Sequence, residues 1–435
     1  MNTCSVCKKE FEDKYFDIEQ DKCILHSNNK EKDIKLFWEK IREIIKEQDE
    51  DILVKISFEK VFFPKCEEKG LAEASHDNGT DFLELGKKEF NKKIFFKECT
   101  FWDDIDFRFI TFKKGLTFEK CTFDKELNFK NKTFEKGSKV RIQNSKKIAN
   151  VNFENTTFKD LADFYGSYFY DTNFFKTTFE DISVFTEAVF HKDINFKYTT
   201  FKELVLFRKT IFEQSINLED SIIKDEMNFL ESSSSKDKIK DLKVANRETA
   251  RIIKNEFEKQ NNIIESNKFY ALEMQKREDE LKLLENPLEW LIFKAHSISS
   301  NHSQSWLLAL MWIFIFGLVA SISHLDNINT LYITPSLFTF LMTFFIIWCT
   351  ELNKYMKFLV TLMFLLLTLL NALVQDVEEP EKYKNIFDIF ADKINPFSIM
   401  TSPDTITFGI LIFKTVIAYL IYQFIISVRQ NTRRK

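Results

Sequence analysis

The sequence predicts a mainly β protein, in which a parallel β-helix is followed by a helical linker and an all-α transmembrane domain. Three observations lead to this prediction. Phenylalanine recurs at steps of five and six residues between Phe90 and Phe229, the next fifty residues have helical apolar spacing, and four later segments are almost uncharged. A fixed short period of this kind is an internal repeat, and internal repeats are typical of stacked, quasi-one-dimensional folds.

The repeat is a ladder of phenylalanines with an irregular patch in its middle. Its first run steps by 6, 5, 6, 5, 6, 5, 6 and 5 residues. That run is Phe90, Phe96, Phe101, Phe107, Phe112, Phe118, Phe123, Phe129 and Phe134. The second run is Phe153, Phe158, Phe164, Phe169, Phe174, Phe179, Phe185, Phe190, Phe196, Phe201, Phe207, Phe212, Leu218, Ile223 and Phe229. Composition bias would explain the abundance of phenylalanine but not its phase.

The residue two positions before each ladder member alternates in size. Large apolar residues precede the six-step members: Ile105, Leu116, Leu127, Ile194, Val205 and Ile216. Small residues precede most five-step members: Cys99, Cys121, Thr156, Thr177, Ala188, Thr199, Thr210 and Ser221. Ile110 and Lys132 break the alternation. Residues i and i−2 of an extended segment point to the same face, so both are expected inside a narrow coil.

This pattern resembles the pentapeptide-repeat family, whose centre position is usually Leu or Phe and whose i−2 position is usually small. The resemblance covers about a third of the chain and implies a right-handed quadrilateral parallel β-helix over residues 90–235. The extra residue in every second unit departs from the family and predicts a coil of 22 residues. Phe101 should then stack on Phe123, whereas Phe169 should stack on Phe190 across only 21 residues, because one six-step is missing there.

Charge argues against one known role of the family. Some pentapeptide-repeat proteins resemble B-DNA in shape and acidity and bind topoisomerase in its place. Residues 90–229 hold 23 Lys plus Arg and 22 Asp plus Glu, so the acidic stripe for such mimicry is absent and no nucleic-acid partner is expected. A basic run in the irregular patch is either a solvated loop or a contact with anionic lipid or a partner. It comprises Lys136, Lys139, Arg141, Lys146 and Lys147.

Residues 1–30 predict a zinc knuckle. Cys4, Cys7, Cys23 and His26 form a C-x2-C-x15-C-x2-H arrangement, and two close pairs of this type can surround one tetrahedral Zn²⁺. Four protein ligands leave no open position, so the predicted zinc is structural. The alternative is a set of unrelated reduced thiols. Zinc-binding thiols imply a reducing compartment, and since no signal peptide is recognised, this end is expected in the cytosol.

The segments that flank the ladder predict caps. Residues 31–89 contain helical spacing from Ile34 to about Glu47, which would cover the open end of the β-helix, then a first coil at residues 56–63 and an insertion. Residues 236–300 resemble the helical hairpin and linker of membrane-attached family members. Their apolar residues either close the last coil or line a partner-binding groove.

Residues 301–435 predict a four-helix transmembrane domain. The spans are Trp306–Ser323, Leu331–Thr350, Phe358–Val374 and Ile406–Val428. Lys354 and Lys357 lie between spans two and three, and four basic residues follow the last span. The positive-inside rule therefore predicts a multi-pass protein of a bacterial cytoplasmic (inner) membrane with both termini in the cytosol.

Two features of this domain are candidates for function. The acidic segment 375–404 contains a short amphipathic pattern that is either a re-entrant pore helix or an interfacial helix, and it lacks the filter sequence of potassium channels. Lys414 is the clear intramembrane charge. Such a residue is a functional candidate by default, but it can also snorkel to the outer face or pair with a neighbouring helix.

The motifs of enzymes are missing from the sequence. It has no P-loop, no nucleophile elbow and no pair of histidines at metal or triad spacing, and only 8 Gly. We therefore expect a non-enzymatic membrane protein whose cytosolic β-helix is an interaction platform, with the lipid bilayer and an unidentified protein as partners. The alternative is an ion channel or pore-forming effector with the β-helix as sensor. Whether the protein forms a homo-oligomer stays open.

Overall fold

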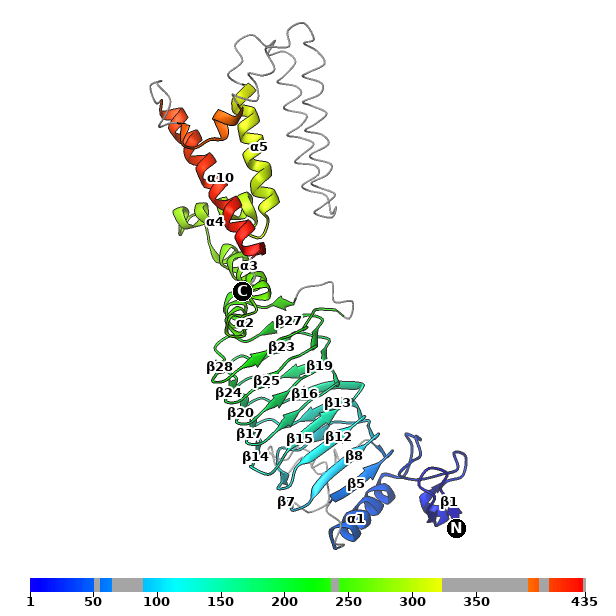
Figure 1. Ribbon diagram of the computed structural model, residues 1–435. Coiled ribbons are helices and arrows are strands. Elements are labelled where there is room, and N and C mark those ends of the chain that lie inside the picture. The colour runs from blue at the N-terminus through cyan, green and yellow to red at the C-terminus, as the bar shows by residue number, and fades with distance from the viewer. Residues whose placement is uncertain (51–54, 65–88, 236–241, 323–389, 399–406, 433–435) are drawn as a thin grey trace. The chain divides into compact units, whose positions relative to one another are not determined.

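The computed structural model describes residues 1–50, 55–64, 89–235, 242–322, 390–398 and 407–432. These residues fall into two compact units, Met1–Glu273 and Met274–Lys435. Figure 1 shows the strands of the first unit stacked as successive rungs. The predicted spans 331–350 and 358–374 and most of the acidic segment 375–404 lie outside the described residues.

Two small hairpins and one helix precede the repeats. The strands β1 (Asn2–Thr3) and β2 (Glu10–Phe11) pair antiparallel, as do β3 (Phe16–Asp17) and β4 (Lys22–Cys23). A single 3-10 turn, η1 (Asp13–Tyr15), lies between the hairpins. The helix α1 (Ile34–Glu50) buries Phe37, Trp38, Ile41 and Ile45.

The repeats form three main parallel sheets. The eight-stranded sheet contains β5 (Lys55–Glu59), β8 (Lys93–Lys97), β12 (Leu116–Glu119), β15 (Val140–Gln143), β18 (Ala162–Asp163), β21 (Ser183–Val184), β25 (Val205–Leu206) and β29 (Met227–Asn228). The eleven-stranded sheet contains β6 (Phe62–Phe63), β9 (Thr100–Phe101), β10 (Ile105–Asp106), β13 (Thr122–Asn128), β16 (Lys147–Asn152), β19 (Tyr168–Asn173), β22 (Val189–Phe190), β23 (Ile194–Asn195), β26 (Ile211–Phe212), β27 (Ser215–Asn217) and β30 (Lys243–Val244). The five-stranded sheet contains β14 (Thr133–Phe134), β17 (Thr157–Phe158), β20 (Thr178–Phe179), β24 (Thr200–Phe201) and β28 (Ile222–Ile223), and β7 (Glu89–Phe90) pairs separately with β11 (Thr111–Phe112).

The register of these strands confirms the predicted fold class, a parallel β-solenoid accompanied by helices. Phe101 pairs with Phe123, and their rings are stacked with centroids 4.9 Å apart. Phe169 pairs with Phe190 across the shorter coil, with centroids 5.2 Å apart. The phenylalanines of the ladder thus stack in columns along the interior, and almost all of them are fully buried.

The irregular patch of the sequence is a longer coil in the structure, with a register shift between Phe123 and Glu126 where β13 pairs with β16. Ile142 pairs with Phe118 and Ile148 pairs with Phe123, so two isoleucines occupy ladder positions. Part of the basic run also lies in strands rather than in a loop, because Arg141 belongs to β15 and Lys147 to β16. The sequence pattern missed this coil because it followed phenylalanine, whereas the interior requires only a large apolar side chain.

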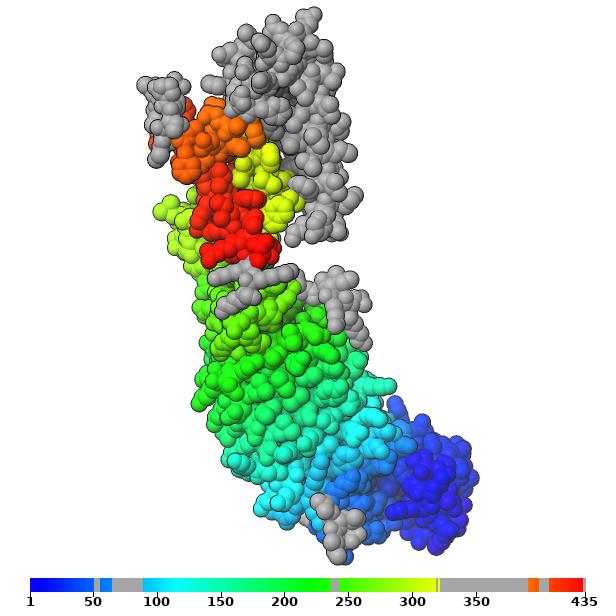
Figure 2. Space-filling model, viewed as in Figure 1, coloured from blue at the N-terminus to red at the C-terminus, as the bar shows by residue number. Residues whose placement is uncertain are grey.

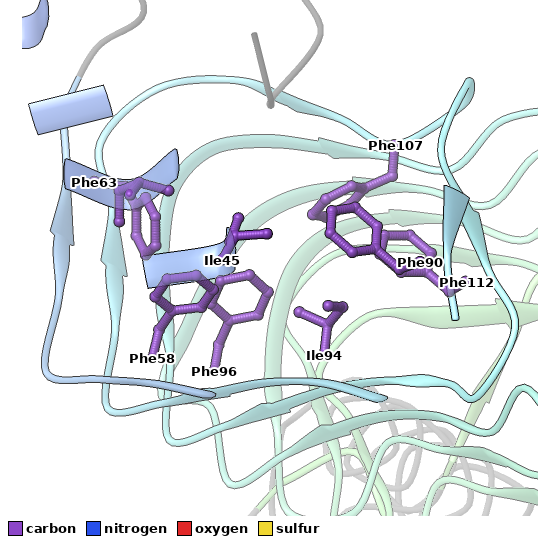
Figure 3. A pocket seen from close by; sticks show the side chains of 9 residues that line it. Ile45, Phe58, Phe63, Phe90, Ile94, Phe96, Phe107 and Phe112 are labelled. Carbon is purple, nitrogen blue, oxygen red and sulfur yellow. The ribbon is translucent and has the colours of Figure 1, made fainter. Parts of the chain in front are cut away.

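The first coil is covered by α1. Ser57 N in the edge strand β5 donates to Gln48 Oε1 (2.7 Å), and Gln48 Nε2 donates to Ser57 O (3.4 Å). One side chain thereby satisfies both backbone groups of an edge residue, which would otherwise be open to pairing with another chain. An apolar cavity of ≈ 10 Å³ remains beneath α1 (Figure 3), lined by Ile41, Ile45, Phe58, Phe63, Phe90, Ile94, Phe96, Phe107 and Phe112.

The last coil is covered by α2 (Arg247–Lys259), whose N-cap is Asn246. Leu218 N donates to the buried Thr249 Oγ1 (2.9 Å), and Met227 N donates to Glu256 Oε2 (2.9 Å). Side chains of the helix thus accept the hydrogen bonds that a further coil would accept. The helix α3 (Ile263–Glu280) follows and packs Phe269 on Phe257 of α2.

On each coil, a five-residue step of the ladder contains a residue in the left-handed backbone conformation. Non-glycine residues have φ near +55° two positions after a ladder member, and several of them are charged. These are Lys60, Glu98, Lys120, Asn131, Asn144, Asn155, Lys176, Glu187, Tyr198, Lys209, Asp220 and Glu231. This conformation costs about 1 to 2 kcal/mol for most residues but less for asparagine, whose side chain bonds locally.

Lys176→Asn is therefore expected to stabilise the β-helix by about 0.5 to 1 kcal/mol, since Asn131 and Asn155 already occupy the same position on earlier coils. Lys224→Asn is the control, because Lys224 is not among the residues with positive φ. Hydrogen exchange of the β-helix amides measures both changes. An equal effect of the two substitutions would contradict the explanation.

The described part of the second unit is helical. It contains α4 (Pro287–Ser300), α5 (Trp306–Ile322) and α10 (Phe408–Thr432), and residues 390–394 form a further short helical segment. Among the described residues, α10 is the one helix long and apolar enough to cross a membrane, and α5 contributes the shorter apolar stretch Trp306–Gly317.

Candidate functional site

The N-terminal module brings its four predicted ligands together through two tight turns. Cys4 O accepts from Lys8 N (2.9 Å), and Cys23 O accepts from His26 N (2.9 Å). The thiols of Cys4, Cys7 and Cys23 and one ring nitrogen of His26 all lie within 4.8 Å of one another. Among the described residues, no other group of three or more His, Cys, Asp and Glu side chains is arranged in this way.

The orientation of the imidazole shows which atom faces the cluster. His26 Nδ1 lies 3.0 Å from Cys23 Sγ and 3.6 Å from Cys4 Sγ, whereas Nε2 lies 3.0 Å from Glu59 O. A histidine ligand commonly donates its other N–H to a carbonyl group, which sets the tautomer and the ring angle. Nδ1 is thereby directed at the thiols, as a metal ligand would be.

The chemistry of the donors suits a metal ion. Burial raises the pKa of the Cys23 thiol and lowers the pKa of His26, so without a metal the thiol keeps its proton. Binding of a metal displaces thiol protons, and the set of three sulfurs and one nitrogen is typical of four-coordinate Zn²⁺. Because all four ligands come from the protein, such a centre supports the fold and leaves no place for a substrate.

The module is attached to the first coil of the β-helix. Phe62 N donates to Leu25 O (2.9 Å). The buried Lys32 Nζ donates to the oxygens of Ile24 (2.9 Å), Ser27 (2.7 Å) and Phe62 (3.0 Å), and so joins both parts. Loss of the metal should therefore disturb the module and its attachment, but not the stacked coils.

Residues 174–222 match the family model for pentapeptide repeats, with 9 copies. The β-helix carries pentapeptide repeats. The match lies within the second run of the ladder, where the steps from Phe174 onward alternate between five and six residues. No curated protein and no solved structure matches the chain.

In this pentapeptide-repeat β-helix, small buried hydroxyls link successive coils. Thr156, Thr177 and Thr199 each donate Oγ1–H at 2.7 Å to a carbonyl oxygen of a phenylalanine one coil earlier. All three are fully buried. The i−2 position is therefore small because its side chain lies between two coils, and a hydroxyl is accommodated there because a carbonyl accepts its proton.

Lys132 lies in the same column and is an exception. It is 5% exposed, its Nζ donates to Ile110 O, and it lies 5.3 Å from the ring centres of both Phe112 and Phe134. Among the described strands, β11 and β14, which contain the two phenylalanines beside Lys132, do not pair with each other. The strand β11 pairs with the earlier β7, and β14 pairs with the later β17. Burial lowers the pKa of Lys132 to about 8.

Lys414 pairs with a neighbouring segment, which is one of the alternatives left by the sequence. It is 7% exposed on α10. Its Nζ donates to the carbonyl oxygens of Asp392 (2.6 Å), Lys393 (3.3 Å) and Asn395 (2.8 Å) and to Ser398 Oγ (2.6 Å). The ammonium thus lies at the C-terminal end of helical residues 390–394, where the last carbonyls of the helix and the helix dipole favour a cation.

A second buried polar cluster was missed by the sequence interpretation, which treated the histidines as scattered. His302 is fully buried, with Nε2 3.0 Å from Glu278 Oε2 and Nδ1 3.4 Å from His296 Nδ1. His296 Nε2 lies 3.0 Å from Ser303 Oγ. Three consecutive residues, 301–303, are left-handed, with φ of 49°, 52° and 65°. The spacing of two histidines six residues apart gave no signal, because this turn and α3 bring the partners together.

We call the place where α3, α4 and the turn 301–303 meet the histidine junction, and we expect acid to weaken this junction. Burial lowers the pKa of both His296 and His302 below the ordinary 6.5, so the unfolded junction binds protons at a higher pH than the folded one. Stability is therefore fully present above pH 6.5 and falls as the pH drops from 6.5 through the lower folded pKa values. Glu278 and Lys294, which face His302, carry opposite charges.

Hydrogen exchange of the α4–α5 amides at several pH values measures this effect. The His302→Gln variant should lose part of the acid response, and His191→Gln, on the β-helix, should retain all of it. An identical pH dependence in wild type and His302→Gln would contradict the assignment.

Proposed function

We propose that this protein is a non-enzymatic scaffold, in which a multi-pass membrane domain holds a cytosolic pentapeptide-repeat β-helix that presents its outer surface to a protein partner. The observation that carries the proposal is the combination, in one chain, of a phenylalanine-filled repeat and the 25-residue apolar helix α10. A helix of that length extends about 37 Å, which exceeds the ~30 Å hydrocarbon thickness.

The shape of the repeat supports a role for its surface. Its interior is occupied by stacked rings, and Figure 2 shows a continuous surface over the repeats in the face in view. Charges on that surface pair between neighbouring coils, as in Lys197–Glu219 (2.8 Å) and Lys202–Glu180 (2.7 Å). Such a neutral, paired surface favours a protein partner over nucleic acid.

The neighbouring ends of α5 and α10 support a common side for both termini. Asn431 Nδ2, near the end of α10, donates to Gln304 O (3.1 Å), just before α5. Ser300 Oγ donates to Gln423 Oε1 (3.0 Å). The chain therefore enters α5 where it leaves α10, which suits cytosolic termini together with the basic tail. In this arrangement the N-terminal cluster binds structural Zn²⁺ in the reducing cytosol.

Two measurements on the full chain test the scaffold. The protein should stay with membranes after alkaline carbonate extraction, and a photo-crosslinker at Tyr198, which is 46% exposed on the β-helix, should yield one discrete protein adduct in cells. A crosslinker at the buried Phe201 is the control and should yield none. Release from membranes would reject the anchor, and the absence of any adduct from exposed positions would reject the platform.

A second candidate, an ion channel gated through the β-helix, is favoured by one observation. Residues 390–394 lie against α5, since the rings of Phe314 and Phe390 are stacked with centroids 5.7 Å apart and a Cβ on Gly317 would lie 2.6 Å from Ile394. Lys414 of α10 closes the end of this segment. A helical segment that packs on one long helix and contacts a residue of another suits a re-entrant pore helix.

Reconstitution under a salt gradient separates the two candidates. A scaffold should show no conductance in wild type, Lys414→Leu or Lys414→Glu. A channel should show wild-type currents whose reversal potential shifts with the charge at position 414. In either case Lys414→Leu should weaken the membrane domain, because it removes the hydrogen bonds of Lys414 Nζ to residues 392–398 from a buried site.

A further inference from the structure

The helix α4 has an apolar face that no described residue covers. Leu288, Leu291, Ile292 and Ile298 are 78%, 60%, 64% and 57% exposed. The last three of these residues follow Leu288 by three, four and ten positions, which places all four along one side of the helix. Four large apolar side chains in one row exceed the scattered exposure that is normal for a protein surface in water.

The other side of α4 is engaged within the same unit. Glu289 accepts from Arg277 Nη2 of α3 (2.7 Å), and Ser300 donates to Gln423 of α10 (3.0 Å). His296 belongs to the buried cluster with His302 and Glu278. These contacts determine the rotation of α4 about its axis, so its apolar row is directed outward and cannot turn inward without breaking them.

The connection to α5 places α4 at the end of a membrane helix. The turn 301–305 joins α4 to Trp306, the first residue of α5, and Trp312 Nε1 donates to Ile298 O (3.0 Å). Figure 1 shows α4 running across the direction of α5 and α10 rather than along it. A helix that crosses the direction of the spans at their end lies parallel to the bilayer surface.

We infer that α4 is an interfacial helix, whose apolar row Leu288, Leu291, Ile292 and Ile298 is embedded in the cytosolic leaflet of the lipid bilayer. Trp290 and Lys294, 5.8 Å apart as a cation and ring pair, lie on the same helix, and both residue types are favoured at the level of the headgroups. The polar side is already hydrogen-bonded inside the protein, so insertion leaves no unpaired polar group in lipid.

This location has a mechanical consequence. The helix α4 contacts α3, which ends the linker from the β-helix, and also α5 and α10. Lipid on the outer side and this polar network on the inner side would hold the linker at a defined depth.

The inference depends on the membrane anchor proposed above, and one experiment distinguishes the two. The full chain, reconstituted in vesicles of phosphatidylcholine and phosphatidylglycerol with an alkyne-tagged acyl chain, carries benzoylphenylalanine at one position. The positions are Leu291 in the apolar row, Ser297 on the opposite side of α4, Ile412 on α10 (49% exposed) and Tyr198 on the β-helix.

Illumination should attach lipid at Leu291 and Ile412 several-fold more than at Ser297 and Tyr198. Lipid labelling at Ile412 without labelling at Leu291 would overturn the interfacial helix and leave the anchor intact. An adduct of Leu291 with a second copy of the chain would also overturn it, by assigning the apolar row to a protein interface. Absence of lipid at both positions would reject the anchor together with the inference.

Discussion

Replacing Cys23 with Ser should abolish metal binding by the full chain and unfold the N-terminal module. Cys23 is fully buried and faces His26 Nδ1 at 3.0 Å, so its loss removes a ligand and leaves a hydroxyl among thiols. Binding of structural zinc contributes about 10 to 16 kcal/mol in small zinc-binding peptides, which exceeds the stability of a module of this size. Removal of zinc with a chelator should have the same effect.

Metal analysis and hydrogen exchange together measure this prediction. Wild type should hold one zinc ion per chain, and in Cys23→Ser the exchange should increase in the N-terminal module but not in the β-helix. Cys99→Ser is the matched control, because Cys99 is a buried thiol in the column where later coils have Ser167 and Thr210. Zinc retained in the Cys23→Ser variant would reject the four-ligand centre.

Lys132→Thr should stabilise the β-helix at neutral pH. Folding lowers the pKa of Lys132 from 10.5 to about 8, which corresponds to a penalty of about 3 kcal/mol for the buried charge. Loss of contacts with two rings and of packed methylenes offsets part of this gain, so a net increase of about 1 to 2 kcal/mol in the free energy of unfolding is expected. Threonine already occupies this column at Thr156, Thr177 and Thr199.

The pH dependence of the free energy of unfolding tests the same prediction independently. The unfolded chain binds a proton at this lysine up to pH 10.5, whereas the folded chain releases it above about pH 8. Wild-type stability should therefore rise between pH 8 and 10.5, and this rise should be absent in Lys132→Thr. Lys159→Thr is the control, since Lys159 forms an exposed pair with Glu135 (2.9 Å). A destabilised Lys132→Thr variant with an unchanged pH profile would show that the charge is not the source of the penalty.

The ladder shows why much of the fold was predictable. Each step from one phenylalanine to the next is a local turn of five or six residues, so the geometry of the coil is written into the spacing. Once the coil closes, the register follows, and Phe101 must meet Phe123. The ligands Cys4, Cys7, Cys23 and His26 were recognisable for a similar reason, because each turn holds two ligands at short spacing.

Other features depend on residues that the chain brings together from a distance. Ile142 and Ile148 could be recognised as ladder members only from their pairing with Phe118 and Phe123. Three of the four partners of Lys414 are backbone carbonyls, which every residue has and no sequence pattern marks.

The histidine cluster and the exposed row of α4 belong to this second group. His296 and His302 meet Glu278 because α3, α4 and a left-handed turn converge, and the same convergence decides which side of α4 is left outside. Local spacing therefore determined the repeat, the metal ligands and the apolar helices. The pairing of buried charges and the direction of the amphipathic face were determined by packing between separate elements, since the free energy of a buried polar group depends on partners that lie far away in the chain.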